Sequence, residues 1–153
     1  MLSDHVSLRL GLQFREVARL SNQDPIPRAL SLYARIPFCS SPCVRRDCDR
    51  VVSRDTRRGD AYPARLVREI ALVAPLFDRD REVVQLHLDG STPDFLAAGQ
   101  VAELMETFNR HFHFAPEKRR DFSIEFDPCR VETSDIEALA FMGFNRASLG
   151  VQD

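Results

Sequence analysis

The chain has 153 residues and a net charge of −2, and its 44% hydrophobic and 29% charged residues are ordinary for a globular protein. This balanced charge gives no field that would attract nucleic acid, and no apolar stretch is long enough to cross a bilayer, so we expect neither partner. No N-terminal segment has the apolar region of a secretory signal. The sequence therefore predicts a cytoplasmic protein, in which clustered cysteines are more often metal ligands or catalytic groups than disulfides.

The hydrophobic pattern alternates between strand and helix periods from residue 30 onward. Residues 1–28 form a weakly patterned lead-in, in which a few apolar residues have helical spacing before 22–27 breaks the pattern. Short apolar or alternating runs predict strands over 30–36, 83–88, 122–126 and 146–151.

Helices are predicted between these strands. The first begins at a cap on Asp60 and ends near Pro75, and the second carries an apolar stripe over 101–112. A capping box of Ser134 and Glu137 begins the third helix, which ends at Gly143. This alternation predicts an α/β fold with parallel strands and right-handed crossovers.

Unusual polar residues follow the ends of the predicted strands. A loop with three cysteines follows the first strand, and 89–93 follows the second. Glu125 lies near the end of the third strand and Gln152 follows the fourth. Ligands bind at this rim in parallel α/β folds, so the four segments predict one common site.

The cysteine loop contains Cys39, Cys43 and Cys48. Thiolates this close share a metal ion, an iron–sulfur cluster or a redox role, because soft sulfur binds soft or borderline metals. The alternative for Cys39 and Cys43 is that they are two buried thiols without a ligand. A zinc site that adds His87 or Cys129 is a further alternative, since structural zinc normally takes four ligands.

Residues 33–39 (Tyr-Ala-Arg-Ile-Pro-Phe-Cys), with Cys43 four residues later, resemble the opening of the radical S-adenosylmethionine enzymes. They look most like the oxygen-independent coproporphyrinogen III oxidase family. The resemblance continues in chain order and covers about 11–153, with further matches at 51–54, 74–77, 85–87, 92–93, 123–128 and 143–153.

This resemblance implies a partial parallel (β/α) barrel of the radical S-adenosylmethionine type over 29–153, truncated to about four strands. It implies a 4Fe–4S cluster and S-adenosylmethionine as cofactors. The family reaction is the oxidative decarboxylation of coproporphyrinogen III to protoporphyrinogen IX in heme biosynthesis. The sequence does not identify the electron donor.

The resemblance also implies roles for single residues. Cys39 and Cys43 match cluster ligands, and Tyr33 matches a residue that lies against the cluster and the cofactor. The other cofactor-binding positions are Gly90, Ser91 and Thr92 in the loop that receives the methionine part, Glu125 at a first cofactor molecule, and Gln152 at a second.

The chain departs from the family pattern at this site. The third ligand position holds Arg46, whose guanidinium has no lone pair to offer iron. Cys48 is close enough in the chain to act as a rescue ligand. Other departures are Arg45 for an aromatic residue, Arg35 for a usual histidine, and Asp89 and Ser91 for two glycines.

The family barrel continues beyond the fourth strand, so that strand is expected to be an unpaired edge that favours self-association or a partner chain. Two hypotheses remain. In one, the chain is a family enzyme that is inactive alone and active only if Cys48 restores the cluster and another polypeptide completes the barrel. In the other, it is a non-catalytic remnant that binds S-adenosylmethionine, porphyrin or a partner.

Overall fold

The computed structural model describes residues 2–26, 28–39, 51–52, 57–92, 96–126 and 131–149. Its centre is a parallel sheet with the order β1-β4-β6-β7, and a short strand β5 also pairs with β4. The strands are β1 (Leu30–Ile36), β4 (Glu82–Thr92), β5 (His113–Phe114), β6 (Asp121–Phe126) and β7 (Arg146–Leu149). β2 (Phe38–Cys39) and β3 (Val51–Val52) form a separate parallel pair.

The predicted α/β fold is confirmed. The four predicted strands correspond to β1, β4, β6 and β7, and no pairing joins β1 to β7 in the described residues, so the sheet is open as in a partial barrel. The second predicted strand was too short, because β4 continues to Thr92 and pairs there with Phe126. The pairs β2–β3 and β4–β5 were missed, since strands of two residues carry no periodic signal.

The helices are α1 (Leu2–Asn22), α2 (Arg57–Val73), α3 (Ala98–His111) and α4 (Thr133–Phe141), with short 3₁₀ turns at η1 (Ala74–Leu76) and η2 (Glu117–Arg119). The predicted cap on Asp60 is wrong, because α2 already begins at Arg57. None of the described helices has the length and the apolar composition needed to span a membrane.

Both ends of α4 follow local hydrogen-bonding rules. The predicted box of Ser134 and Glu137 is wrong, because the helix begins after Glu132, whose N–H donates to Asp135 Oδ2 at 3.0 Å. The predicted stop at Gly143 is confirmed. Gly143 has φ of +96°, a conformation that glycine adopts without steric cost.

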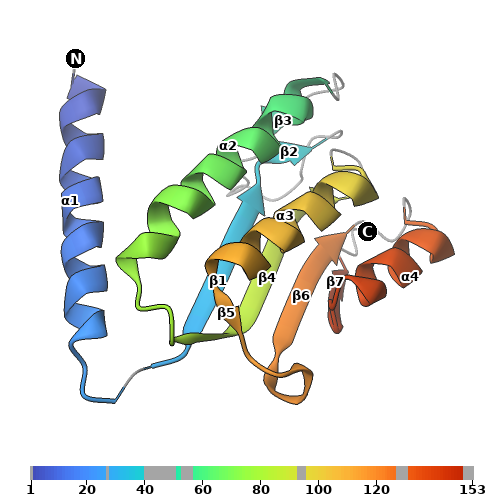
Figure 1. Cartoon of the computed structure of the whole chain (residues 1–153). Helices are drawn as coiled ribbons and strands as arrows, with labels where there is room; N and C mark the ends of the chain where they lie inside the picture. The colour runs from blue at the N-terminus through green and yellow to red at the C-terminus, as the bar shows by residue number, and fades with distance from the viewer. Residues whose placement is uncertain are drawn as a thin grey trace.

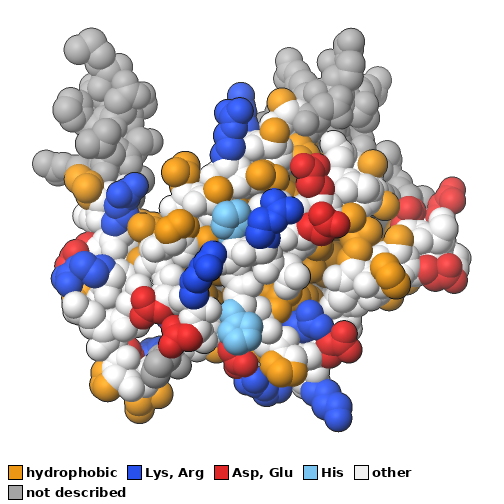
Figure 2. Space-filling view, in the orientation of Figure 1, with side chains coloured by type: hydrophobic (Ala, Val, Ile, Leu, Met, Phe, Trp, Pro, Cys, Tyr) orange, Lys and Arg blue, Asp and Glu red, His pale blue; other side chains and the backbone are white. Residues whose placement is uncertain are grey.

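Helices α2, α3 and α4 lie side by side over one face of the sheet (Figure 1). The core fills the space between these layers and is built from the sheet residues Ile36, Leu86, Leu88, Phe122 and Ile124 and the α3 residues Val101, Leu104 and Phe108. On the helix side the described acidic and basic side chains are interspersed with apolar ones, and no continuous basic surface is visible (Figure 2).

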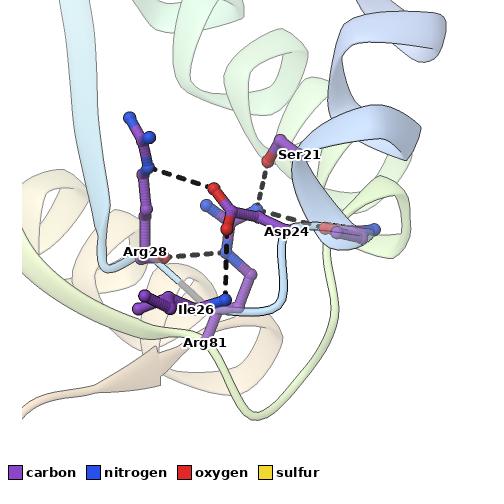
Figure 3. A network of polar contacts seen from close by, with 6 residues as sticks. Ser21, Asp24, Ile26, Arg28 and Arg81 are labelled. Carbon is purple, nitrogen blue, oxygen red and sulfur yellow. Dashed lines mark hydrogen bonds and ion pairs between the residues drawn. The ribbon is translucent and has the colours of Figure 1, made fainter.

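Helix α1 stands beside this layer and is held near its carboxyl end (Figure 1). The buried Arg81, which is 7% exposed, donates to the Arg28 carbonyl at 2.9 Å, to Asn22 Oδ1 at 3.1 Å and to the Ser21 hydroxyl (Figure 3). Asn22 also donates to the Leu76 carbonyl at 2.9 Å. These bonds tie the end of α1 to η1 and to the start of β4.

Candidate functional site

The two faces of the sheet differ in chemistry. Along β1, β4 and β6, alternate residues either lie in the helix-covered core or project from the opposite face. The residues on that opposite face are Ser31, Tyr33 and Arg35 on β1, Gln85, His87 and Asp89 on β4, and Asp121, Ser123 and Glu125 on β6. Parallel strands covered by apolar layers on both faces are almost continuously hydrophobic, so this alternation indicates a face that meets water or a polar ligand.

Three of these residues form one row across neighbouring strands. Tyr33 pairs in register with His87, and His87 with Ser123. The rings of Tyr33 and His87 stack with centroids 5.4 Å apart and an interplanar angle of 28°. His87 Nδ1 lies 2.6 Å from Ser123 Oγ, so the ring is fixed from both sides.

Tyr33 also reaches the next residue pair on this face. Its hydroxyl donates to Asp89 Oδ2, and this hydrogen bond is the main reason that the pKa of Tyr33 is raised above 10.0. Partial burial and the negative charges of Asp89 and Glu125 raise the pKa of Tyr33 further, while Arg35 opposes them. The hydrogen bond to Asp89 therefore favours the protonated Tyr33 hydroxyl, whose one proton it uses.

Arg35 lies beside Asp89 in the register of β1 and β4. The Tyr62 hydroxyl of α2 donates to its backbone carbonyl at 2.8 Å. The side chain is half-buried, and its Nε atom is buried without a hydrogen-bond partner in the described structure.

The structure brings together part of the predicted site. Tyr33 lies in the middle of β1 and Glu125 near the carboxyl end of β6, on the same face of the sheet, and the negative charge of Glu125 contributes to the raised pKa of Tyr33. The three residues Gly90, Ser91 and Thr92 belong to the end of β4, where Ile36 pairs with Gly90, so their prediction as a loop is wrong. Cys39 ends β2, and its side chain is outside the described part of the structure.

Other predicted residues lie outside the described residues: Cys43, Arg45, Arg46, Cys48, Cys129 and Gln152. Among the residues that the structure describes, no group of three His, Cys, Asp or Glu side chains is arranged to hold a metal ion.

Sequence reasoning missed His87, Ser123 and Arg35 as parts of one surface. A usable signal was present. Polar residues alternate with apolar ones on three successive strands, and strict alternation predicts a polar face once the strands are aligned.

The family cofactors fit this chain unequally. The motif positions for the three cluster ligands hold Cys39, Cys43 and Arg46, and a guanidinium cannot ligate iron, so this donor set does not fit a 4Fe–4S cluster. The polar face carries a positive side chain, Arg35, and negative side chains, Asp89 and Glu125. It therefore suits a ligand that has charges of both signs, such as S-adenosylmethionine.

No family model matches the chain. The chain is 41% identical over 140 residues to oxygen-independent coproporphyrinogen III oxidase of Pseudomonas aeruginosa, covering 92% of this chain and 30% of that protein. It is 40% identical over 148 residues to the enzyme of Salmonella typhimurium, covering 96% of this chain and 32% of that protein.

A solved structure of coproporphyrinogen III oxidase from Escherichia coli, described as a radical SAM enzyme, superposes with a TM-score of 0.74. It is 41% identical in sequence, and the match covers 82% of this chain and 28% of that one. The chain thus spans roughly a third of the length of the relatives it matches, 30% and 32% for the two curated ones. By sequence and by fold, it is a partial-length homologue of the oxygen-independent coproporphyrinogen III oxidases, of which the Escherichia coli one is described as a radical SAM enzyme.

Proposed function

We propose that this chain carries the S-adenosylmethionine-binding part of an oxygen-independent coproporphyrinogen III oxidase fold. The observation that supports this most is the polar face of the open sheet, where Asp89 and Glu125 lie towards the carboxyl ends of β4 and β6 and the Tyr33 hydroxyl reaches Asp89. Ligands bind at this edge in parallel α/β folds. The end of β4, with Gly90, Ser91 and Thr92, lies at the same edge and forms the rest of the proposed site, and Gln152 is assigned to it from the family resemblance alone.

The family reaction is the oxidative decarboxylation of coproporphyrinogen III to protoporphyrinogen IX in heme biosynthesis. We propose that these residues do not carry it out alone. Arg46 occupies a position that needs a thiolate, and the sheet is open at both ends in the described residues. Cys39 and Cys43 keep their positions, and Cys48 is the single nearby thiol that would restore a third ligand.

Anaerobic reconstitution with iron and sulfide tests the proposed loss of the cluster. We expect the purified chain to hold far less than four irons and four sulfides, and Cys39→Ala to change this little. A stable cluster with near-complete iron and sulfide that disappears in both Cys39→Ala and Cys48→Ala would support the second candidate, an enzyme subunit rescued by Cys48 that needs a partner chain to complete the barrel.

Titration calorimetry with S-adenosylmethionine tests the retained ligand site. Binding should be measurable for the unaltered chain and weaker for Tyr33→Ala, because that change removes the stacked ring and the hydrogen bond to Asp89. Leu72→Ala is a matched control, since Leu72 is 70% exposed on α2, on the helix-covered side. Absence of binding to the unaltered chain would refute the proposal.

A further inference from the structure

On the polar face, the guanidinium of Arg35 has no hydrogen-bond or ion-pair partner among the described residues. Its Nε atom is buried and makes no hydrogen bond within the described structure. The described ion pairs engage Arg19, Arg28, Arg119, Arg120 and Arg146, and none of them involves Arg35. A buried donor without an acceptor is costly, so such a group calls for a physical explanation.

The nearest carboxylate in the strand register does not supply that acceptor. Asp89 is paired with Arg35 through the backbone of β1 and β4, but its Oδ2 atom accepts the Tyr33 hydroxyl. No contact within ion-pair distance joins Asp89 to Arg35 among the described residues. Tyr62 bonds only the backbone carbonyl of Arg35 and leaves the side chain available.

The neighbouring charges narrow the kind of ligand. Arg35 is positive, whereas Asp89 and Glu125 act on the same Tyr33 hydroxyl with negative charge. A ligand with a carboxylate at one point and a cation at another matches this arrangement. A planar guanidinium is also well shaped for two parallel hydrogen bonds to a carboxylate.

We propose that Arg35 is a carboxylate-binding residue of the polar face, and that it binds the carboxylate of the ligand while Asp89 and Glu125 face positive charge. This inference rests on the proposed S-adenosylmethionine site and assigns the residue that holds one end of the ligand. The tetrapyrrole substrate of the homologues also carries carboxylates, so the experiment includes both sources.

The test compares the unaltered chain with Arg35→Gln, Arg35→Lys and the control Arg110→Gln, which changes an exposed arginine on α3. Calorimetry measures binding of S-adenosylmethionine and of its decarboxylated form, and fluorescence measures binding of coproporphyrin III. Circular dichroism checks that each variant is folded.

We expect Arg35→Gln to weaken S-adenosylmethionine binding about ten- to a hundredfold, the range for a lost charged hydrogen-bonding pair. Arg35→Lys should recover only part of this, because an ammonium lacks the planar fork. Decarboxylated S-adenosylmethionine should bind the unaltered chain weakly, and Arg35→Gln should not change its affinity.

The outcomes are separable from those of the proposed function. If Arg35→Gln weakens only coproporphyrin III binding, Arg35 binds a tetrapyrrole carboxylate and the inference stands with that source. If S-adenosylmethionine does not bind the unaltered chain, the proposed function fails, and the coproporphyrin arm still decides the role of Arg35. Equal binding by Arg35→Gln and the unaltered chain in both arms, or no binding in either arm, would overturn the inference.

Discussion

Replacing Arg81 with methionine should loosen the attachment of α1. Arg81 is 7% exposed and donates to the Arg28 carbonyl, to Asn22 Oδ1 and to the Ser21 hydroxyl. Its guanidinium carbon also lies 5.5 Å from the centre of the Phe77 ring. Methionine keeps most of the apolar stem, so the change removes the charge and the donors and leaves the three acceptors without this partner (Figure 3).

The expected loss follows from these contacts. A hydrogen bond to a charged group is worth about 1.5–3 kcal/mol, and bonds that share one donor group are not additive. All three hydrogen bonds are only part-buried, so the free energy assigned to each is reduced, because water can replace some of the lost interaction. We therefore expect Arg81→Met to lower the free energy of unfolding by about 2–4 kcal/mol.

Urea denaturation measures the global loss, and hydrogen exchange over 11–22 reports whether α1 detaches. Exchange there should accelerate more than in α3, which is packed over the sheet core. Arg79→Met is the matched control in the same turn, because Arg79 is exposed and should change stability by less than about 0.5 kcal/mol. A loss below about 1 kcal/mol for Arg81→Met, with unchanged exchange in α1, would contradict the reasoning.

Three further predictions concern the backbone, the tyrosine and the cluster motif. Gly143→Ala should lower the free energy of unfolding, measured by urea denaturation, by about 1 kcal/mol, because Gly143 has φ of +96°. Gly99→Ala in the first turn of α3 should not lower it, since no atom lies within 4 Å of the added Cβ. Asp89→Asn should bring the pKa of Tyr33 down towards 10.0 in an ultraviolet titration. The pKa of Tyr33 is raised in the folded state, so its hydrogen bond stabilises the fold at pH values below the unfolded pKa, and this stabilisation is lost as pH rises through the folded pKa. The free energy of unfolding of Asp89→Asn should therefore fall less at alkaline pH than that of the unaltered chain. An unchanged titration of Tyr33 would contradict the assigned hydrogen bond. Arg46→Cys restores the family spacing of thiolates and should raise iron and sulfide retained after anaerobic reconstitution, and unchanged metal content would show that other departures also block assembly.

Local patterns predicted the main elements of this fold. The strands β1, β4, β6 and β7 were found because their apolar residues alternate or cluster, and the stop of α4 at Gly143 follows from glycine chemistry. The beginnings of α2 and α4 were misplaced, because several nearby polar residues offer equivalent caps and only the folded backbone selects among them.

The candidate site was predicted less completely. The strand pattern placed Glu125 at the rim and the family resemblance assigned Tyr33 to the cofactor, and both residues lie on the polar face of the sheet. The bond from Tyr33 to Asp89 and the row through His87 depend on the register of neighbouring strands, which no local pattern specifies. The Arg81 network is nonlocal for the same reason, since its members come from separate parts of the chain.

The alternation along β1, β4 and β6 gives each strand two kinds of position, one in the core and one on the polar face. Substitutions such as Arg35 and Asp89 fall on positions that project away from Ile36, Leu88 and the rest of the helix-covered core. Mutations on the polar side can therefore change its chemistry while packing on the other side keeps the chain folded. A lineage with this architecture can lose its ancestral chemistry gradually and still retain a stable scaffold, on which a new binding activity can evolve.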